Sequence, residues 1–489
     1  MQVKEQEFMA SKSNLDIFFD PGSVAVVGAT ERPGSWGSFI MQSLISWKYR
    51  GKIYPVNLRA KTVFEVPAYR DMGEIPGDVD LAVLTIPEEY VKETLLACAQ
   101  KAVKGVVIIT SGFSETSSEG REKEMALVEI ARRHEMRILG PNVSGVFDLH
   151  NSFVAAGARS RRLKSSTLAA VSQGGFAFQD LLASGANRGM GVAKFAHTGN
   201  ECDLTVTDFL EYYARDEKIK GILLYIESIR DGRRFMDVAR RATDKKPVVV
   251  YKAGRTAGSA RAARSHTAAL TGDWKVYQGL FKQVGVMVCP RMELLLPLSH
   301  ALSDRPPLQG NRVGIITMGG SWGVVLTDTL EEAGLHVPEL SHGLQRNLRQ
   351  MGMPERASTR NPIDIGAAGP FPPLQMVLSM AKEVLLSGEI DALVLHGVGR
   401  PGMEEGSGKP GNDPFLEFET ALMEGLVELE REISRPVLIG NHYTPWESQA
   451  VHEMNRKGIM IYNRIDDIAT ILALMHEYWR QRRRCTGCG

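Results

Sequence analysis

The chain has 489 residues, of which 58 are lysine or arginine and 57 are aspartate or glutamate, so its formal net charge at pH 7 is +1. A chain of this length is too long to fold around a single hydrophobic core, and the usual size of roughly 100 to 200 residues per domain predicts three domains. Basic and acidic residues are balanced, with no segregated basic face that could bind a phosphate backbone. We therefore do not expect this protein to bind nucleic acid. No signal peptide and no run of roughly 20 apolar residues is visible, so we expect a soluble, cytoplasmic protein without a membrane segment.

The five cysteines are too few for a disulfide framework and fit a reducing compartment. Cys485 and Cys488 form a CxxC pair close to the end of the sequence. A structural zinc site needs four ligands and there is no second pair, so we expect a solvated tail and no metal site. A metal or redox function of this pair is the less favoured alternative.

Short runs rich in β-branched residues recur along the chain, and each is followed by a glycine-rich turn and an apolar pattern of helical period. This order is typical of parallel α/β units. Runs that begin at Ser23, Leu168 and Val313 each open a block of roughly 150 residues, which predicts three doubly wound domains in series. The expected domains are residues 1–148, 149–302 and 303–489.

In the first domain, the run that ends at Val27 leads into a turn from Gly28 to Gly37 and then into an amphipathic helix. Backbone amides after such a turn can face a phosphate, although any doubly wound domain needs glycine there. The spacing is not GxGxxG, and the second strand ends in Asn57-Leu58-Arg59 instead of the acidic residue that holds the ribose of NAD. NAD is therefore disfavoured, whereas Arg59 suits a phosphorylated ribose, as in NADP or coenzyme A.

Further strand ends follow at 84–87, 108–113 and 138–142, and the carboxyl ends of strands are where open parallel sheets bind ligands. The order of these five turns resembles the CoA-binding domain of succinyl-CoA synthetase and of the ADP-forming acyl-CoA synthetases. The resemblance implies a Rossmann-like domain that binds coenzyme A. The residues it assigns to this binding are Gly28, Ala29, Thr30, Ser35, Gly37, Asn57, Arg59, Ile86, Pro87, Ser111, Gly112 and Asn142.

In the second domain, three strand ends carry candidate site residues. The turn 172–175 (Ser-Gln-Gly-Gly) precedes a helix, so Ser172 would be its N-cap and the following amides could bind an anion. Asn200 follows the next strand at the same edge, and His197 within that strand is interpreted as a packed or surface histidine. A third strand ends at Glu227, a carboxylate that is costly after an apolar strand unless it has a partner.

The segment 253–272 is nearly free of bulky apolar side chains and contains His266. A segment that cannot anchor itself by burial is a candidate for function. Imidazole is nucleophilic near neutral pH, and a carboxylate such as Glu227 on its other nitrogen would orient it and support its cationic form. From composition alone, a loop histidine among solvated arginines is the favoured interpretation.

Three segments resemble the ADP-forming acyl-CoA synthetases: 265–272 is similar to their phosphohistidine segment, 224–227 to the strand with the supporting glutamate, and 172–175 to their Ser-Gln-Ser-Gly turn. The resemblance implies that His266 is phosphorylated and that Glu227 supports it. The residues it assigns to phosphate or acyl phosphate in this domain are Ser172, Gln173, Gly174, Gly175, Gly199 and Asn200. Two residues depart from the family pattern, since Ala268 replaces a glycine and Gly174 replaces a serine.

The third block opens with 315–323 and resembles the flavodoxin-like ligase domain of the same family. The resemblance implies two flavodoxin-like domains whose helix N-termini, at Gly174-Gly175 and at Gly320-Ser321, stabilise the charge of the phosphohistidine. Ordinary capping is the alternative. No Walker motif and no spare block of about 200 residues for an ATP-grasp domain is visible. The domain order is similar to that of the alpha subunit of the two-subunit enzymes of this family, and this resemblance implies a separate ATP-grasp beta subunit, in a hetero-oligomer, that binds ADP or ATP with Mg²⁺.

The resemblance covers nearly the whole chain and implies a subunit of an ADP-forming acyl-CoA synthetase, which interconverts acyl-CoA, ADP and phosphate with carboxylic acid, ATP and CoA. The intermediates would be an acyl phosphate and a phosphohistidine. A CoA- or acyl-CoA-binding regulatory protein without turnover is the alternative, which Ala268 and the missing ATP-grasp domain favour. An NADP-linked oxidoreductase is disfavoured by the lack of GxGxxG. The residues do not choose among acetyl, branched, aryl and dicarboxylic acids, or between ADP and GDP.

Overall fold

The computed structural model describes residues 15–157, 163–259, 273–369, 372–401 and 414–485. These residues divide into two compact units, the first within Met1–Ala183 and Gly191–Ser299, the second within Ser184–Met190 and His300–Gly489. Among the helices of the described residues, none has the length and apolar character needed to cross a membrane.

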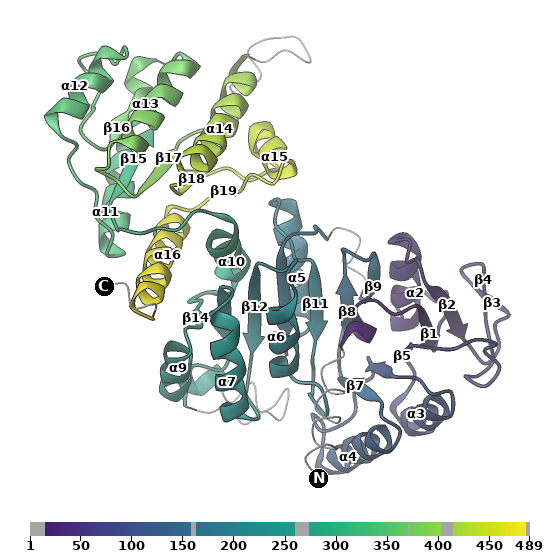
Figure 1. The fold of residues 1–489 in the computed structure, drawn as a ribbon. Helices are drawn as coiled ribbons and strands as arrows, with labels where there is room; N and C mark the ends of the chain where they lie inside the picture. Colours follow the sequence, from purple (N-terminus) through teal and green to yellow (C-terminus); the bar gives the residue numbers. More distant parts are fainter. Residues whose placement is uncertain (1–14, 158–162, 260–272, 370–371, 402–413, 486–489) are drawn as a thin grey trace. The chain divides into compact units, whose positions relative to one another are not determined.

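The N-terminal domain is built on a parallel sheet with the strand order β2-β1-β5-β6-β7 (Figure 1). Its strands are β1 (Ser23–Val27), β2 (Lys52–Val56), β5 (Leu81–Leu84), β6 (Gly105–Ile108) and β7 (Arg137–Leu139). Its helices are α2 (Trp36–Ser46), α3 (Val91–Gln100) and α4 (Ser118–Arg133), with short 3-10 turns η1 (Asp16–Phe18) and η2 (Glu88–Tyr90) and a hairpin of β3 (Thr62–Val63) and β4 (Val66–Pro67). The strand order reverses between β1 and β5, and open α/β sheets bind ligands at such a switch point.

Strands β1, β5 and β6 are buried along their whole length, as expected for a parallel sheet that is covered on both faces. Helix α2 begins where the Ser35 side chain accepts a hydrogen bond from the backbone N–H of Ser38. A Cβ atom on Gly37 would lie 2.1 Å from the carbonyl oxygen of Gly28, whose φ is +88°. Glycine at both positions therefore lets α2 approach the turn after β1.

The second sheet has the order β14-β13-β12-β10-β11-β8-β9, in which β10 to β14 pair in parallel and β8 and β9 are antiparallel. Its strands are β8 (Gly145–Asp148), β9 (Phe153–Ala156), β10 (Leu168–Ser172), β11 (Lys194–His197), β12 (Gly221–Ile226), β13 (Val248–Lys252) and β14 (Met287–Val288). Its helices are α5 (Phe176–Asn187), α6 (Val206–Arg215), α7 (Gly232–Thr243), α9 (Trp274–Gln283) and α10 (Leu295–Asp304), with the 3-10 turn η4 (Met292–Leu294).

The expected boundary between residues 148 and 149 separates β8 from β9, and both strands belong to the second sheet. Helix α2 of the first domain packs against β9, where the Ser43 hydroxyl donates to the Ala156 carbonyl at 3.1 Å (Figure 1). A single hydrophobic cluster contains Val26 of the first sheet and Val171 of the second. The first two domains thus share one compact unit, and the second sheet begins at Gly145.

The third sheet is parallel and has the order β16-β15-β17-β18-β19. Its strands are β15 (Val313–Thr317), β16 (Ile363–Asp364), β17 (Ala392–His396), β18 (Val437–Gly440) and β19 (Ile461–Tyr462). Its helices are α11 (Gly320–Glu332), α12 (His342–Gln350), α13 (Leu374–Leu386), α14 (Pro414–Ile433), α15 (Gln449–Arg456) and α16 (Ile465–Cys485), with the 3-10 turn η5 (Ile365–Ala368). The expected boundary between residues 302 and 303 lies within α10. The predicted α/β class with parallel, doubly wound sheets is confirmed.

Candidate functional site

A cavity of about 570 Å³ lies at the carboxyl ends of β1, β2 and β5 in the N-terminal domain. Val27, Val56 and Met72 contribute a buried apolar floor, while Arg59 and Arg70 are exposed. Guanidinium groups pair with phosphates, and an apolar floor suits a ring or an aliphatic chain, so the cavity fits a ligand that combines both. The residues of this lining that the sequence assigned to coenzyme A are Gly28, Asn57, Arg59, Ile86 and Pro87.

The other residues assigned to coenzyme A divide into two groups. Ala29, Thr30 and Ser35 belong to the turn between β1 and α2, and Gly37 is the second residue of α2. Asn57 holds this turn by donating from Nδ2 to the Ala29 carbonyl at 2.8 Å. The lining of the cavity does not include Ser111, Gly112 or Asn142, which follow β6 and β7.

The turn 172–175 lies between β10 and the N-terminus of α5, as predicted, but its two polar side chains bond within the protein. The Ser172 hydroxyl, which is fully buried, donates to the Gly174 carbonyl at 2.5 Å. The Gln173 carboxamide bonds to the backbone at Glu227 and Ser228, at the end of β12. An anion at this turn would therefore meet backbone N–H groups rather than these side chains.

The glycines of this turn lie against aromatic rings. A Cβ atom on Gly174 would be 2.7 Å from Cε1 of Tyr225, and one on Gly175 would be 3.0 Å from Cε1 of His197. The departure from the family pattern at Gly174 thus has a physical reason, because the serine that it replaces would collide with the Tyr225 ring.

His197 is buried, with 5% of its surface exposed, and bonds through both ring nitrogens. Nδ1 accepts from the backbone N–H of Ser144 at 2.7 Å, so Nε2 carries the proton of the neutral ring and donates to the Gln173 carbonyl at 3.0 Å. Burial lowers the pKa of His197 to about 4. The ring is thus a neutral, packed support for the 172–175 turn, the first of the two interpretations that the sequence left open.

Asn200 lies where the first two domains meet. Its Nδ2 donates to Oε2 of Glu115 at 2.5 Å and to Oε2 of Glu124 at 3.0 Å, and its Oδ1 accepts from Nδ2 of Asn142 at 3.4 Å. Glu115 also accepts from the backbone N–H of Gly112 at 2.6 Å. The structure therefore brings together Asn142 and Gly112, assigned to coenzyme A, and Asn200, assigned to phosphate. Sequence reasoning missed both carboxylates: Glu115 lies just after the 111–113 turn, whereas Glu124 lies within helix α4.

Glu227 directly follows β12, next to Lys252 at the end of β13. Lys252 is 1% exposed, and burial lowers its pKa to about 8 although the charge of Glu227 opposes that change. Burial and the same carboxylate raise the pKa of Tyr225 to about 12. The attraction between the charges of Lys252 and Glu227 offsets part of the cost of a carboxylate at this position. Sequence reasoning did not assign a role to Lys252, although a lysine at the end of an apolar strand indicates a buried charge near the strand end. His266 lies outside the described residues.

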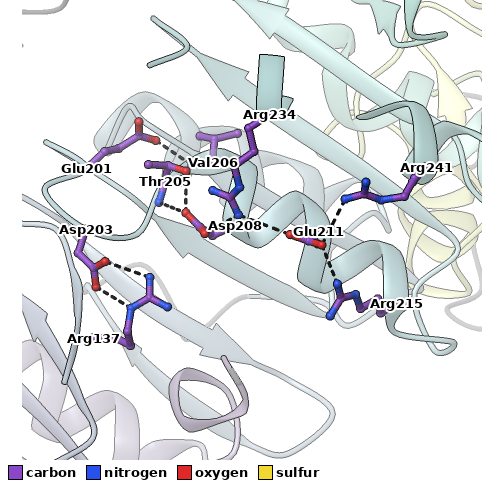
Figure 2. A network of polar contacts seen from close by, with 10 residues as sticks. All are labelled: Arg137, Glu201, Asp203, Thr205, Val206, Asp208, Glu211, Arg215, Arg234 and Arg241. Carbon is purple, nitrogen blue, oxygen red and sulfur yellow. Dashed lines mark hydrogen bonds and ion pairs between the residues drawn. The ribbon is translucent and has the colours of Figure 1, made fainter. Parts of the chain in front are cut away.

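A polar network connects the segment from Glu201 to Asp208, which directly follows Asn200 in the chain, with β7 and α7 (Figure 2). Arg137 of β7 forms a bidentate pair with Asp203, at 2.8 and 3.0 Å. Thr205 and Asp208 cap α6, and Arg234 of α7 donates to Asp208 at 2.8 Å. Charge-assisted bonds of this kind hold loops in one conformation, so the edge of the sheet that carries Asn200 is rigidly attached to β7 and α7.

Glu201 is the buried acid of this loop, and its Oε1 accepts from the backbone N–H of Val206 at 2.8 Å and from the Thr198 hydroxyl at 3.0 Å. Burial raises the pKa of its carboxyl from 4.5 to about 7. The folded protein therefore binds more protons than the unfolded chain between these values, and this acid costs stability as the pH rises through 7.

Glu201→Gln is expected to be more stable than wild type at pH 8 by about 3 kcal/mol, because Oε1 keeps both donors and no charge is buried. At pH 5 the difference is expected to fall below about 1 kcal/mol, because Glu201 stays protonated in the folded protein. Urea unfolding at the two pH values measures both quantities, with the exposed Glu129→Gln as the control. An equal gain at both pH values, or a loss at pH 8, would contradict the buried charge as the cause.

In the third domain, Gly320 and Ser321 are exposed at the first two positions of α11. A Cβ atom on Gly320 would lie 3.0 Å from Oδ2 of Asp364, at the end of β16. The described residues contain no group of three or more His, Cys, Asp or Glu side chains that could hold a metal ion. Cys485 is the last residue of α16, and Cys488 lies outside the described residues.

Comparisons with known proteins agree with this geometry. A family model of the CoA binding domain matches residues 22–147, and one of the succinyl-CoA ligase like flavodoxin domain matches residues 165–302. The alpha subunit of acetate–CoA ligase (ADP-forming) II of Pyrococcus furiosus is 37% identical over 457 residues, which cover 93% of this chain and 96% of that protein. The alpha subunit of isoenzyme I of the same organism is 41% identical over 363 residues, covering 72% of this chain and 76% of that protein.

Among solved structures, the chain is similar to the dinucleotide forming acetyl-coenzyme A synthetase 1 of Ca. Korarchaeum cryptofilum, in complex with phosphate and ADP. The TM-score is 0.84 at 30% sequence identity, and the match covers 97% of this chain and 98% of that chain. The resemblance inferred from the turns and strand ends is thereby confirmed. The chain belongs to the family of the alpha subunits of ADP-forming acetate–CoA ligases, with a CoA-binding domain followed by a succinyl-CoA ligase-like flavodoxin domain.

Proposed function

We propose that this chain is the CoA-binding and phosphohistidine-carrying subunit of an ADP-forming acyl-CoA synthetase, with acetyl-CoA as the first substrate to test. The observation that carries the proposal is the shared edge of the second sheet. There the 172–175 turn, Asn200 and Glu227 follow the neighbouring parallel strands β10, β11 and β12. Asn200 also contacts Asn142 of the CoA-binding domain, which supports exchange of an acyl group close to this edge.

In the proposed cycle, an oxygen of inorganic phosphate attacks the thioester carbonyl of acyl-CoA, the C–S bond breaks, and CoA leaves as the thiolate. Coenzyme A supplies the thiol in the reverse direction. A ring nitrogen of His266 then attacks the phosphorus of the acyl phosphate, and the carboxylate leaves. Backbone N–H groups at Gly174 and Gly175 would face the phosphoryl oxygens, and Glu227 would support the cationic ring.

The cavity at the carboxyl ends of β1, β2 and β5 is the proposed site of coenzyme A. Arg59 and Arg70 would pair with its phosphates, and the apolar floor with Val27 and Met72 would hold its uncharged parts. Ser111, Gly112 and Asn142 follow the next two strands and would lie toward the thiol end.

The phosphoryl group would pass from His266 to ADP on a separate ATP-grasp beta subunit, in a hetero-oligomer in which Mg²⁺ belongs to the nucleotide. The description of both Pyrococcus furiosus relatives as alpha subunits supports a partner. Gly320 and Ser321 at the start of α11 are the proposed second group of backbone donors for the phosphohistidine.

The test is incubation of the purified chain with acetyl phosphate, followed by intact-mass spectrometry. We expect a phosphoryl adduct that is labile to acid and absent in His266→Ala, while His134→Ala, which changes an exposed histidine, keeps it. An adduct that persists in His266→Ala would contradict the proposed acceptor. Coenzyme A binding without an adduct from any acyl phosphate would favour the regulatory alternative.

A further inference from the structure

Gln173 is buried, with 7% of its surface exposed, and its carboxamide is engaged at both ends. Its Oε1 accepts from the backbone N–H of Glu227 at 2.5 Å and from that of Ser228 at 3.0 Å, and its Nε2 donates to the Ser228 carbonyl at 2.9 Å. A carboxamide oxygen has two acceptor sites, and both are used here. The side chain of Gln173 thus closes the turn at which β12 ends.

The backbone of the same residue contacts β12 and the neighbouring strand end of β11. Its N–H donates to the Tyr225 carbonyl of β12 at 3.1 Å, and its carbonyl accepts from the neutral ring of His197, the last residue of β11. The buried carboxyl of Glu201 also hydrogen-bonds the Gln173 side chain. Gln173 is therefore held from several sides, which makes it a rigid support for the turn that it closes.

Glu227 is the first residue beyond β12, where the ladder of backbone hydrogen bonds with neighbouring strands ends. The backbone orientation there sets the direction in which the Glu227 side chain leaves the chain. Removal of the Gln173 carboxamide would take the acceptor from the N–H groups of Glu227 and Ser228, and partly buried donors without acceptors favour another backbone conformation. The position of the Glu227 carboxylate thus depends on Gln173.

We propose that Gln173 is a positioning residue for phosphoryl transfer, which acts through the backbone of Glu227 and not as a ligand of the phosphate. This inference rests on the proposed function, in which Glu227 supports His266. It replaces the role expected from the sequence, in which the side chain of residue 173 belongs to the phosphate site itself.

A double-mutant cycle on the rate of adduct formation from acetyl phosphate tests this inference. Gln173→Ala is expected to slow the wild-type protein about 10-fold but to slow Glu227→Gln less than about 2-fold further, because both substitutions remove the same effect. Gln345→Ala is the matched control, since Gln345 is a half-buried glutamine that donates to the Leu340 carbonyl in the second unit. Independent, multiplied effects would indicate a direct contact with phosphate and would overturn the inference, as would an unchanged rate in Gln173→Ala.

Amide hydrogen exchange gives a second measurement that does not depend on turnover. Peptides that contain 227–228 are expected to exchange faster in Gln173→Ala, relative to peptides elsewhere in the same variant, and not in Gln345→Ala. If wild type forms no adduct, the proposed function fails, and unchanged exchange at 227–228 would separately overturn the role of Gln173. If Gln173→Ala does not fold, Gln173→Met keeps the size of the side chain and removes the acceptor for both N–H groups, and is expected to show the same pattern.

Discussion

Glu227→Gln is expected to slow phosphorylation of the protein by acetyl phosphate at pH 7 about 100-fold, at unchanged affinity for coenzyme A. The amide keeps the volume of the side chain but carries no charge to support a cationic imidazole. In the structure the charge of Glu227 also acts on the buried Lys252, whose pKa it raises against the larger, opposite effect of burial. Quenched-flow sampling with intact-mass detection gives the rate, and calorimetry with coenzyme A gives the affinity.

The control for this experiment is Asp237→Asn, which makes the same chemical change on α7, where the carboxylate is 68% exposed. Its rate is expected to equal that of wild type. A Glu227→Gln rate within about 3-fold of wild type would remove Glu227 from the mechanism, since a group that supports the cationic ring contributes at least about 10²-fold. A parallel loss of coenzyme A affinity would instead indicate a general disturbance of the fold.

Arg305→Met is expected to destabilise the second unit by about 3 to 5 kcal/mol. The Arg305 side chain is 12% exposed, and its Nη1 donates to both carboxylate oxygens of Glu430, at 2.7 and 2.9 Å, and to the Val437 carbonyl at 2.7 Å. Methionine fills the space but leaves the buried Glu430 carboxylate without its cation. Urea unfolding, followed by far-UV circular dichroism, measures the loss.

Lys382→Met is the matched control in the same unit. Lys382 and Glu432 form an ion pair at 2.6 Å, but 44% and 58% of their side chains are exposed. Exposed pairs contribute less than about 1 kcal/mol, so this variant is expected to unfold close to the wild-type midpoint. Similar losses in the two variants would mean that burial is not what makes the Arg305 pair strong.

The sequence predicted helices, strands and turns well where a short segment contains all the residues that determine the element. The β-branched run before Gly28 and the glycine at position 37 predict a strand, a tight turn and a helix, and the structure places β1, the turn and α2 there. The boundary expected after residue 148 instead cuts the second sheet between β8 and β9, because β8 belongs to that sheet through its pairing with β11. Pairing between distant segments leaves no local trace in the sequence.

The same contrast applies to the candidate site. Strand-end positions follow from the alternation of strands and helices, so the sequence alone predicted that the 172–175 turn, Asn200 and Glu227 share one edge. It did not predict that the Gln173 side chain turns toward Ser228, or that Asn200 contacts Glu115 of the first domain. Both contacts join residues more than 50 positions apart in the chain.

The amino-acid sequence by itself determined the α/β class, the order of the turns and the residue types available at each strand end, because these depend on local periodicity and on glycine at tight turns. Only the tertiary structure decided which side chains are free to meet a ligand. It directs the Ser172 and Gln173 side chains into the protein, buries His197 as a neutral ring, and places Lys252 beside Glu227. The physical reason is that hydrogen-bond pairing and desolvation of a polar group depend on everything packed around it, and those neighbours come from distant parts of the chain.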